Sequence, residues 1–146
     1  MLIDLLQEDL NKALLSKDEV STSTLRMAIS NLKNARIAKG SDLADEEAIG
    51  ELLKDAKRHK ESIAAFEQAG RLELAKKEKA ELEVLSKYLP KQMTDEEIRK
   101  IVDEAIAEVK PQGPADKGKV MSFVMGKVGR RADGAMVASI VSQKLG

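Results

Sequence analysis

Residues Gly113 to Lys119 read GPADKGK and match the spacing of the glycine-rich loop that binds nucleotide phosphates. That chemistry needs a strand before the loop, backbone N–H groups that point at the phosphates, and a Ser or Thr after the lysine to bind Mg²⁺. Here a helical pattern precedes the string, Pro114 has no N–H, and Val120 replaces the hydroxyl residue. We therefore interpret the string as a loop that begins a helix, and we expect no ATP binding there.

His59 is the only histidine, and the chain has no cysteine. A single histidine can act as a general base or as a pH switch. However, no second His or Cys is present to build a metal site, and no paired nucleophile is evident. His59 comes seven residues after Leu52 and seven before Phe66, on or beside an apolar helical stripe. We expect a structural role for it at the edge of the core.

Glu78 falls near the inward face of the following helical pattern. Arg71 lies two helical turns before it, and Arg26 lies on an earlier helix. A carboxylate near arginines can be catalytic, but buried charges usually have structural partners. We interpret Glu78 as a member of a structural ion pair, and we assign no catalytic residue anywhere in the chain.

Two acidic runs, residues 45–47 and 95–97, each stand at the start of a helical pattern. The helix dipole favours negative charge at that position, which accounts for both runs. A metal site would need further ligands from elsewhere, and nothing in the sequence shows them. We therefore expect neither a metal nor a cofactor.

Positive charge is concentrated at the end of a chain whose formal net charge is zero: residues 110–146 carry seven Lys or Arg against two Asp or Glu. Phe123 is the only aromatic residue among them, so stacking on single-stranded bases is not indicated. Contact with a phosphate backbone is the functional interpretation, and a solvated surface is the alternative. The residues expected to contact phosphates are Lys117, Lys119, Lys127, Arg130 and Arg131.

Apolar residues recur at helical spacing throughout, and the core must be built from aliphatic side chains because aromatic residues make up only 2%. The pattern predicts an all-α protein in two domains. Residues 1–90 are expected to form an antiparallel four-helix unit, and residues 91–146 a small three-helix unit. Pro90 marks the boundary because proline cannot continue a helix.

Capping residues and glycines predict where the individual helices begin and end. The second helix is expected to start at Asp18 or at one of the residues from Ser21 to Thr24; Thr94 and Asp133 are expected near later helix starts, and Gly40 and Gly70 at helix ends. The fourth helix is expected over residues 71–88, and Gly126 with Gly129 should close the sixth. The acids in the N-terminal segment exclude a signal peptide and a membrane span, and we expect a cytoplasmic protein with no membrane partner.

Five parts of the sequence together form a specific pattern: TLRMAISNLKNARI, KRHKESIAAFEQAGR, Glu78, YLPKQMTDEEI and GKVMSFVMGKVGRRADGAMVASIV. In these parts the chain resembles the small bacterial YqeY-like proteins. The similarity runs over essentially the whole chain. His59 departs from the pattern, because Arg or another long polar residue is expected at its position.

The resemblance implies two helical units, the second similar to the tail domain of the B subunit of the tRNA-dependent amidotransferase. That enzyme converts glutamate or aspartate, mischarged on tRNA, to the amide with glutamine as nitrogen donor. Its tail helps to hold tRNA, whereas the chemistry lies in other domains. The resemblance therefore implies a non-catalytic accessory module that binds tRNA or another structured RNA. The alternatives are a protein-interaction module and an enzyme, alone or within an amidotransferase complex.

Overall fold

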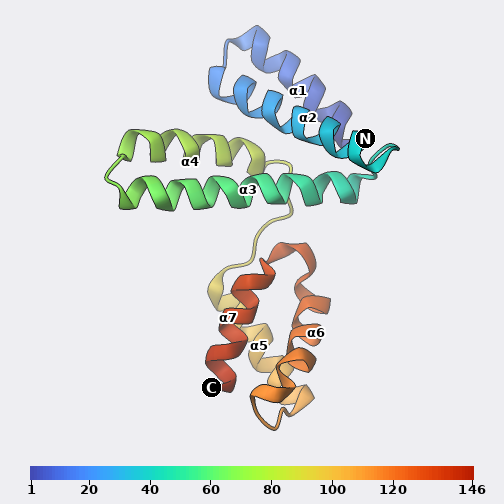
Figure 1. The fold of residues 1–146 in the computed structure, drawn as a ribbon, viewed down its shortest axis with the longest axis vertical. Coiled ribbons are helices and arrows are strands. Elements are labelled where there is room, and N and C mark those ends of the chain that lie inside the picture. The colour runs from blue at the N-terminus through green and yellow to red at the C-terminus, as the bar shows by residue number, and fades with distance from the viewer. The chain divides into compact units, whose positions relative to one another are not determined.

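The computed structural model describes all of residues 1–146 and contains seven α-helices, two 3₁₀ helices and no strand (Figure 1). The predicted all-α class is confirmed. The chain divides into two compact units, Met1–Leu89 and Pro90–Gly146. None of the helices has the length and apolar character needed to cross a membrane.

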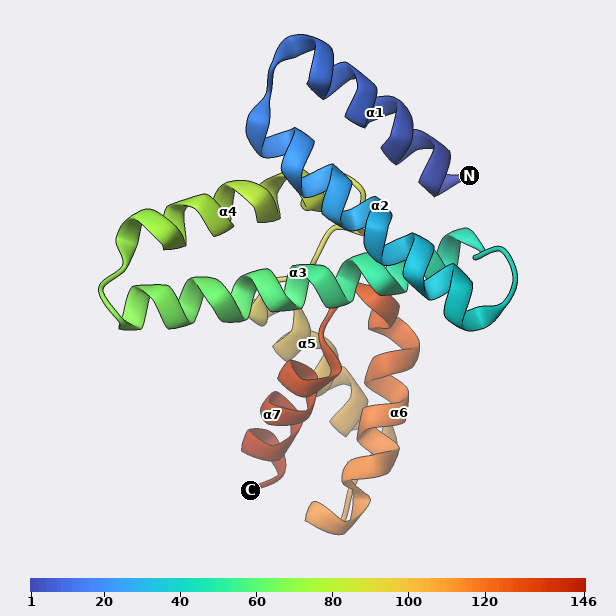
Figure 2. The same cartoon turned by 45° about the horizontal axis from the view of Figure 1, so that its top comes forward.

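The N-terminal unit consists of two helical hairpins. The first pairs α1 (Leu2–Ser16) with α2 (Glu19–Lys39), and the second pairs α3 (Asp45–Gln68) with α4 (Leu72–Ser86). Helix α2 also packs against both helices of the second hairpin and crosses α3 (Figure 2). The fourth helix is shorter at both ends than the predicted span of residues 71–88.

The core of this unit is aliphatic, as the composition predicted. Leu6, Leu25, Leu32, Leu52 and Leu85 are almost completely buried, and they come from all four helices. Burying one leucine side chain stabilises a fold by about 1.5–3 kcal/mol. This shared core holds the two hairpins together and fixes the faces that α2, α3 and α4 turn toward each other.

Local interactions set the helix ends in this unit. The Asp18 carboxylate accepts a hydrogen bond from the Ser21 backbone N–H at 3.1 Å, and Gly40 ends α2 with a left-handed φ of 82°. The hydrogen bonds from Ser21 also lower the pKa of Asp18. At the start of α3, Glu47 accepts a bond from the Ala44 N–H at 3.0 Å. Glu47 therefore satisfies a free backbone donor, in addition to the favourable interaction with the helix dipole that was expected from its position.

The C-terminal unit contains three α-helices, α5 (Asp95–Val109), α6 (Lys117–Val128) and α7 (Gly134–Leu145). The 3₁₀ helices η1 (Pro114–Asp116) and η2 (Gly129–Arg131) flank α6. The core contains nine buried aliphatic residues: Ile98, Val102, Ala105, Val120, Val124, Val128, Val137, Ile140 and Val141. Valine has a weak intrinsic preference for helices, so packing of the buried stripe must sustain α6.

Side-chain caps define the starts of α5 and α7. Thr94 Oγ1 accepts a hydrogen bond from the Glu97 N–H at 3.2 Å, and the Asp133 carboxylate accepts one from the Ala135 N–H at 3.1 Å. Gly126 does not close the sixth helix as expected but lies inside it. The helix continues to Val128 because this residue joins the buried stripe, and it ends at Gly129, where φ is 54°.

Candidate functional site

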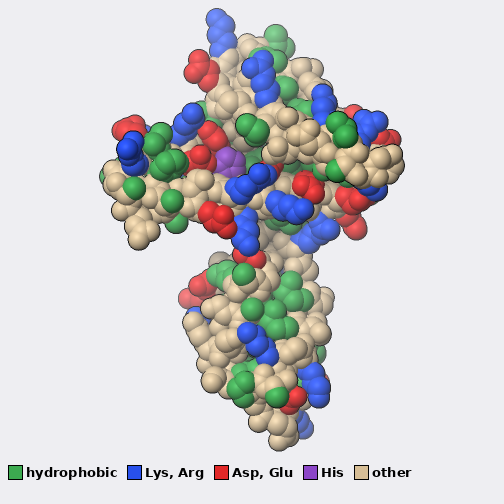
Figure 3. All heavy atoms as spheres, in the orientation of Figure 1, with side chains coloured by type: hydrophobic (Ala, Val, Ile, Leu, Met, Phe, Trp, Pro, Cys, Tyr) green, Lys and Arg blue, Asp and Glu red, His purple; other side chains and the backbone are tan.

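A polar groove of about 440 Å³ opens between α2, α3 and α4 of the N-terminal unit. Its lining includes three acidic residues, two basic residues and the only histidine: Asp55, Glu78, Glu81, Arg58, Lys77 and His59. Figure 3 shows the histidine, in purple, beside acidic side chains on the exposed face. Charged groups concentrated in a hollow distinguish this region as a candidate binding site.

His59, Glu78 and Glu81 form a cluster across the hairpin of α3 and α4. His59 Nδ1 lies 2.5 Å from Glu78 Oε2, within hydrogen-bond distance, and 3.8 Å from Glu81 Oε2. All three side chains are mostly buried, with at most 24% of their surface exposed. Glu78 was expected to form a structural ion pair near arginines, but its partner in the structure is His59.

A second polar network links α2 to α3. The buried Asp55 carboxylate accepts hydrogen bonds from Asn31 Nδ2 at 3.0 and 3.1 Å and pairs with the Arg58 guanidinium. Neither Asp55 nor Asn31 was identified from the sequence as a candidate site residue. Asp55 precedes His59 by four residues, which places both on one face of a helix, and this spacing is the signal that would have found it.

Thr24 adds a buried hydroxyl to the same groove. Only 4% of its surface is exposed, and its Oγ1 has no hydrogen-bond partner. A buried hydroxyl without a partner is energetically unfavourable, so such a group often marks a place where water or a bound molecule completes the site.

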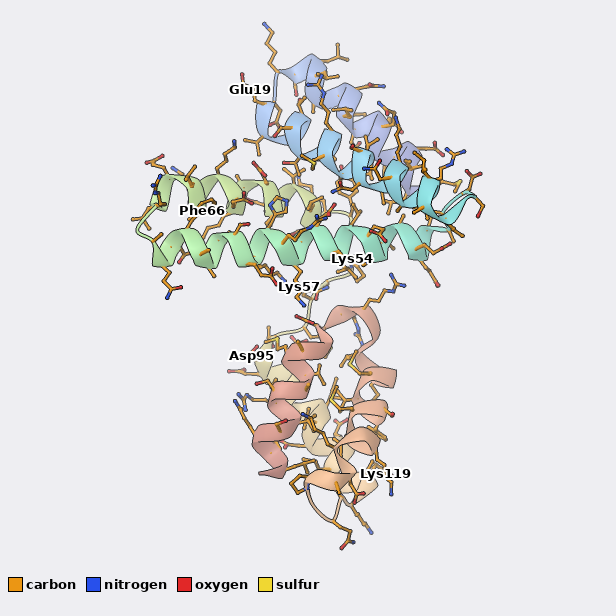
Figure 4. The ribbon with its side chains drawn as sticks, in the orientation of Figure 1. Glu19, Lys54, Lys57, Phe66, Asp95 and Lys119 are labelled. Atoms are coloured by element: carbon orange, nitrogen blue, oxygen red, sulfur yellow. The ribbon has the colours of Figure 1, made fainter.

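The basic residues expected to contact phosphates lie around α6 in the C-terminal unit. Lys117 and Lys119 are in its first turn, where Figure 4 labels Lys119. Lys117 Nζ lies 2.5 Å from Ser142 Oγ, and Lys119 Nζ lies 3.7 Å from the Asp116 carboxylate. Lys119 is well exposed, with 73% of its side chain accessible. An exposed ion pair of this kind contributes little to stability, so the lysine is available for a phosphate.

The other three residues lie at or beyond the end of α6. Lys127 Nζ is 3.4 Å from Glu104 Oε2 and 4.9 Å from the centre of the Phe123 ring. Arg131 donates hydrogen bonds to the carbonyl oxygens of Lys127 at 2.8 Å and Val128 at 3.3 Å. Arg131 therefore caps the helix, in addition to any contact with an anion. Arg130 is exposed in the adjacent 3₁₀ turn.

The Gly113–Lys119 string has a helix before it, as expected, and its first half forms η1. Asp116 accepts a hydrogen bond from the Gln112 N–H at 2.8 Å, and the same carboxylate lies close to Lys119. No strand precedes the string, and Val120 follows Lys119 where a nucleotide-binding loop has the hydroxyl residue that binds Mg²⁺. The conformation of this loop is consistent with the start of a helix.

The chain is therefore an all-helical protein of two units, one with a polar groove and the other with exposed basic residues around one helix. The model of the Yqey-like protein family matches residues 3–145. The chain belongs to this family, and the resemblance found in the sequence is confirmed.

Curated relatives carry the name "Altered inheritance of mitochondria protein 41, mitochondrial". The relative from Lachancea thermotolerans is 33% identical over 94% of this chain and 78% of its own length. That from Pyrenophora tritici-repentis is 30% identical over 97% of this chain and 79% of its own. A relative from Saccharomyces cerevisiae is 31% identical over 69% of this chain, and the match spans 58% of its length.

These names correct one expectation. All three relatives are named as mitochondrial proteins. The predicted cytoplasmic location is therefore wrong. The prediction relied on the acids of the N-terminal segment, which argue against a secretory signal peptide and a membrane span but do not distinguish the cytoplasm from mitochondria.

Proposed function

We propose that this chain is a non-catalytic accessory protein that binds tRNA or another structured RNA through its C-terminal unit. The observation that carries the proposal is a set of five basic residues around α6, of which Lys119, Lys127, Arg130 and Arg131 are exposed and Lys117 is half-buried. The similarity of this unit to the amidotransferase tail, which helps to hold tRNA, supports the same assignment.

The spacing of the basic residues suits a phosphate backbone better than a single small anion. Helix α6 has 12 residues, which corresponds to a length of about 18 Å. Two lysines are in its first turn and two arginines follow its last turn, so the two groups are separated by more than the size of one phosphate. Contacts of this kind position a nucleic acid without reading its sequence.

The direct test is to recover RNA crosslinked to the full chain in cells and to sequence it. Enrichment of tRNA or of another structured class supports the proposal, and recovery no higher than that of an untagged control contradicts it. In vitro, the affinity for tRNA should fall steeply as salt rises, because each neutralised phosphate releases counterions.

A protein-interaction module is the second candidate. Large apolar side chains are exposed in the N-terminal unit, with Leu15 at 86%, Ile37 at 77% and Leu72 at 68% of their surface accessible. Single exposed apolar residues are common on soluble domains, so this observation is weaker than the basic set. A partner bound through these side chains should show little dependence on salt, which separates the two candidates.

A further inference from the structure

We propose that His59, Glu78 and Glu81 bind a divalent transition-metal ion, for which Zn²⁺ is the best match, in the groove of the N-terminal unit. No metal was expected from the sequence, because the chain has no second His and no Cys. The fold supplies the missing ligands as carboxylates from the neighbouring helix. This site is separate from the basic residues of the C-terminal unit and does not depend on the RNA proposal.

The geometry brings one donor atom from each residue close together. The three atoms all lie within 4.8 Å of one another. Zinc binds imidazole nitrogen and carboxylate oxygen at about 2.0–2.2 Å, so donors around one ion are separated by roughly 3.4 Å in a tetrahedral site. The distances from His59 Nδ1, 2.5 Å to Glu78 and 3.8 Å to Glu81, fall on either side of that value. Small side-chain rotations would therefore seat an ion.

The three ligands are held close together because they lie on two helices that pack against each other. Glu78 and Glu81 are three residues apart on α4, so both carboxylates lie on the same face of the helix. His59 projects from α3, which pairs with α4 as a hairpin. Ligands on packed helices are held more rigidly than ligands on loops.

The donor set selects the class of ion. Imidazole suits zinc, iron, copper and nickel, whereas magnesium and calcium prefer oxygen ligands alone. One nitrogen and two carboxylates therefore favour Zn²⁺ over Mg²⁺. The two carboxylates also balance the charge of a divalent ion. Asp55 lies nearby but adds no uncompensated charge, because it is already paired with Arg58 and Asn31.

A simple hydrogen bond between His59 and Glu78 is the competing explanation. That bond does not account for Glu81, whose carboxylate is 3.8 Å from the imidazole nitrogen and too distant for a hydrogen bond. Nor does it account for Thr24, whose buried hydroxyl has no partner in the same groove. Three protein ligands leave a fourth position on zinc for water, and the hydroxyl could bind such a water.

The first experiment titrates the metal-free, untagged full chain with zinc chloride and observes the imidazole resonances by NMR. His59 is the only histidine, so every imidazole signal belongs to it. We expect these signals to shift and to saturate at one equivalent of zinc, and we expect no shift with the same concentration of Mg²⁺. Imidazole signals that do not move in a tenfold excess of zinc overturn the proposal.

The second experiment measures zinc affinity by calorimetry for E78Q and E81Q. Glutamine keeps the size of each side chain and removes its charge. We expect each variant to bind zinc at least about tenfold more weakly, because the loss of even an outer partner of a metal ligand costs about that much. E83Q, on the same helix but exposed, is the matched control and should bind as the unmodified chain does. Unchanged affinity in both E78Q and E81Q overturns the site, because zinc would then be bound elsewhere.

Discussion

Tyr88 and Asp9 form a contact between residues that are 79 positions apart in the chain. The Tyr88 hydroxyl donates a hydrogen bond to Asp9 Oδ2 at 2.5 Å, which ties the segment after α4 to α1. Burial of the phenol, followed by the hydrogen bond and the negative charge of Asp9, raises the pKa of Tyr88 above its usual value. The folded state therefore favours the neutral phenol.

This shift predicts a loss of stability in alkali. A tyrosine in the unfolded chain titrates at about pH 10. The contribution of Tyr88 to folding stability is therefore complete below that pH and is lost as the pH rises toward the raised pKa of Tyr88 in the folded state. Y88F should lower the free energy of unfolding at pH 7 by about 1–2 kcal/mol. Its stability should also fall less between pH 7 and about pH 11 than that of the unmodified chain. Urea unfolding at both values measures this, and parallel losses in the two proteins would contradict the assignment.

His59 and Glu78 show what the sequence could and could not predict about single residues. Both were identified from their positions near apolar stripes, and each was expected to have a structural role. Their partnership was not predictable, because it depends on how α3 and α4 are joined around Gly70, whose φ is 74°. Periodicity places a residue on a helix face, but it does not give the register between two helices.

At the scale of the element, the helix starts were the most predictable features. Thr94 and Asp133 cap their helices because a short polar side chain satisfies backbone N–H groups that have no partner within the helix. The end of α6 was less predictable. Gly126 resembled a terminator, but the buried valines on either side of it extend the helix by packing.

The cap at the start of α5 gives a direct prediction. T94A removes the oxygen that accepts the Glu97 N–H and should lower the free energy of unfolding of the C-terminal unit by about 1 kcal/mol. T94S keeps the hydroxyl and should cost much less. Thermal unfolding followed by circular dichroism compares the two variants, and equal losses would show that the cap does not stabilise the helix.

The loop before α6 gives a second prediction at this scale. Mg-ATP should leave the midpoint of thermal unfolding of the full chain unchanged, because no strand precedes the loop and Val120 replaces the hydroxyl residue that would bind Mg²⁺. Differential scanning fluorimetry over a range of nucleotide concentrations provides the measurement. A saturable increase in the midpoint that K119A abolishes would show that the loop binds nucleotide.

At the scale of the whole molecule, each unit has its own hydrophobic core. The C-terminal unit is small, and a core of that size contributes only a few kcal/mol of net stability. V124A should therefore speed hydrogen exchange throughout α5, α6 and α7, because it removes two methyl groups from a fully buried position. Exchange in α2, α3 and α4 should be unchanged. Equal acceleration in both units would indicate that they unfold together.

The sequence predicted the fold class because seven amphipathic patterns have no competing strand signal. It predicted basic residues but not their individual surroundings, since the contacts of Lys127 and Arg131 depend on residues brought close by folding. Arg131 is accordingly a poor choice for a charge reversal, because its loss would disturb the end of α6. Lys119 and Arg130 are the better pair to replace.

Fluorescence anisotropy of labelled tRNA, measured with full-length K119E/R130E, tests whether the C-terminal unit binds RNA. The control is K33E/K57E, which makes the same change of charge at exposed residues of the N-terminal unit. We predict that the first variant binds at least about tenfold more weakly at low salt and that its salt dependence is shallower by about one unit per lost phosphate contact. The control should bind nearly as the unmodified chain does. Equal weakening by both variants, or no binding by the unmodified chain at low salt, would contradict the account.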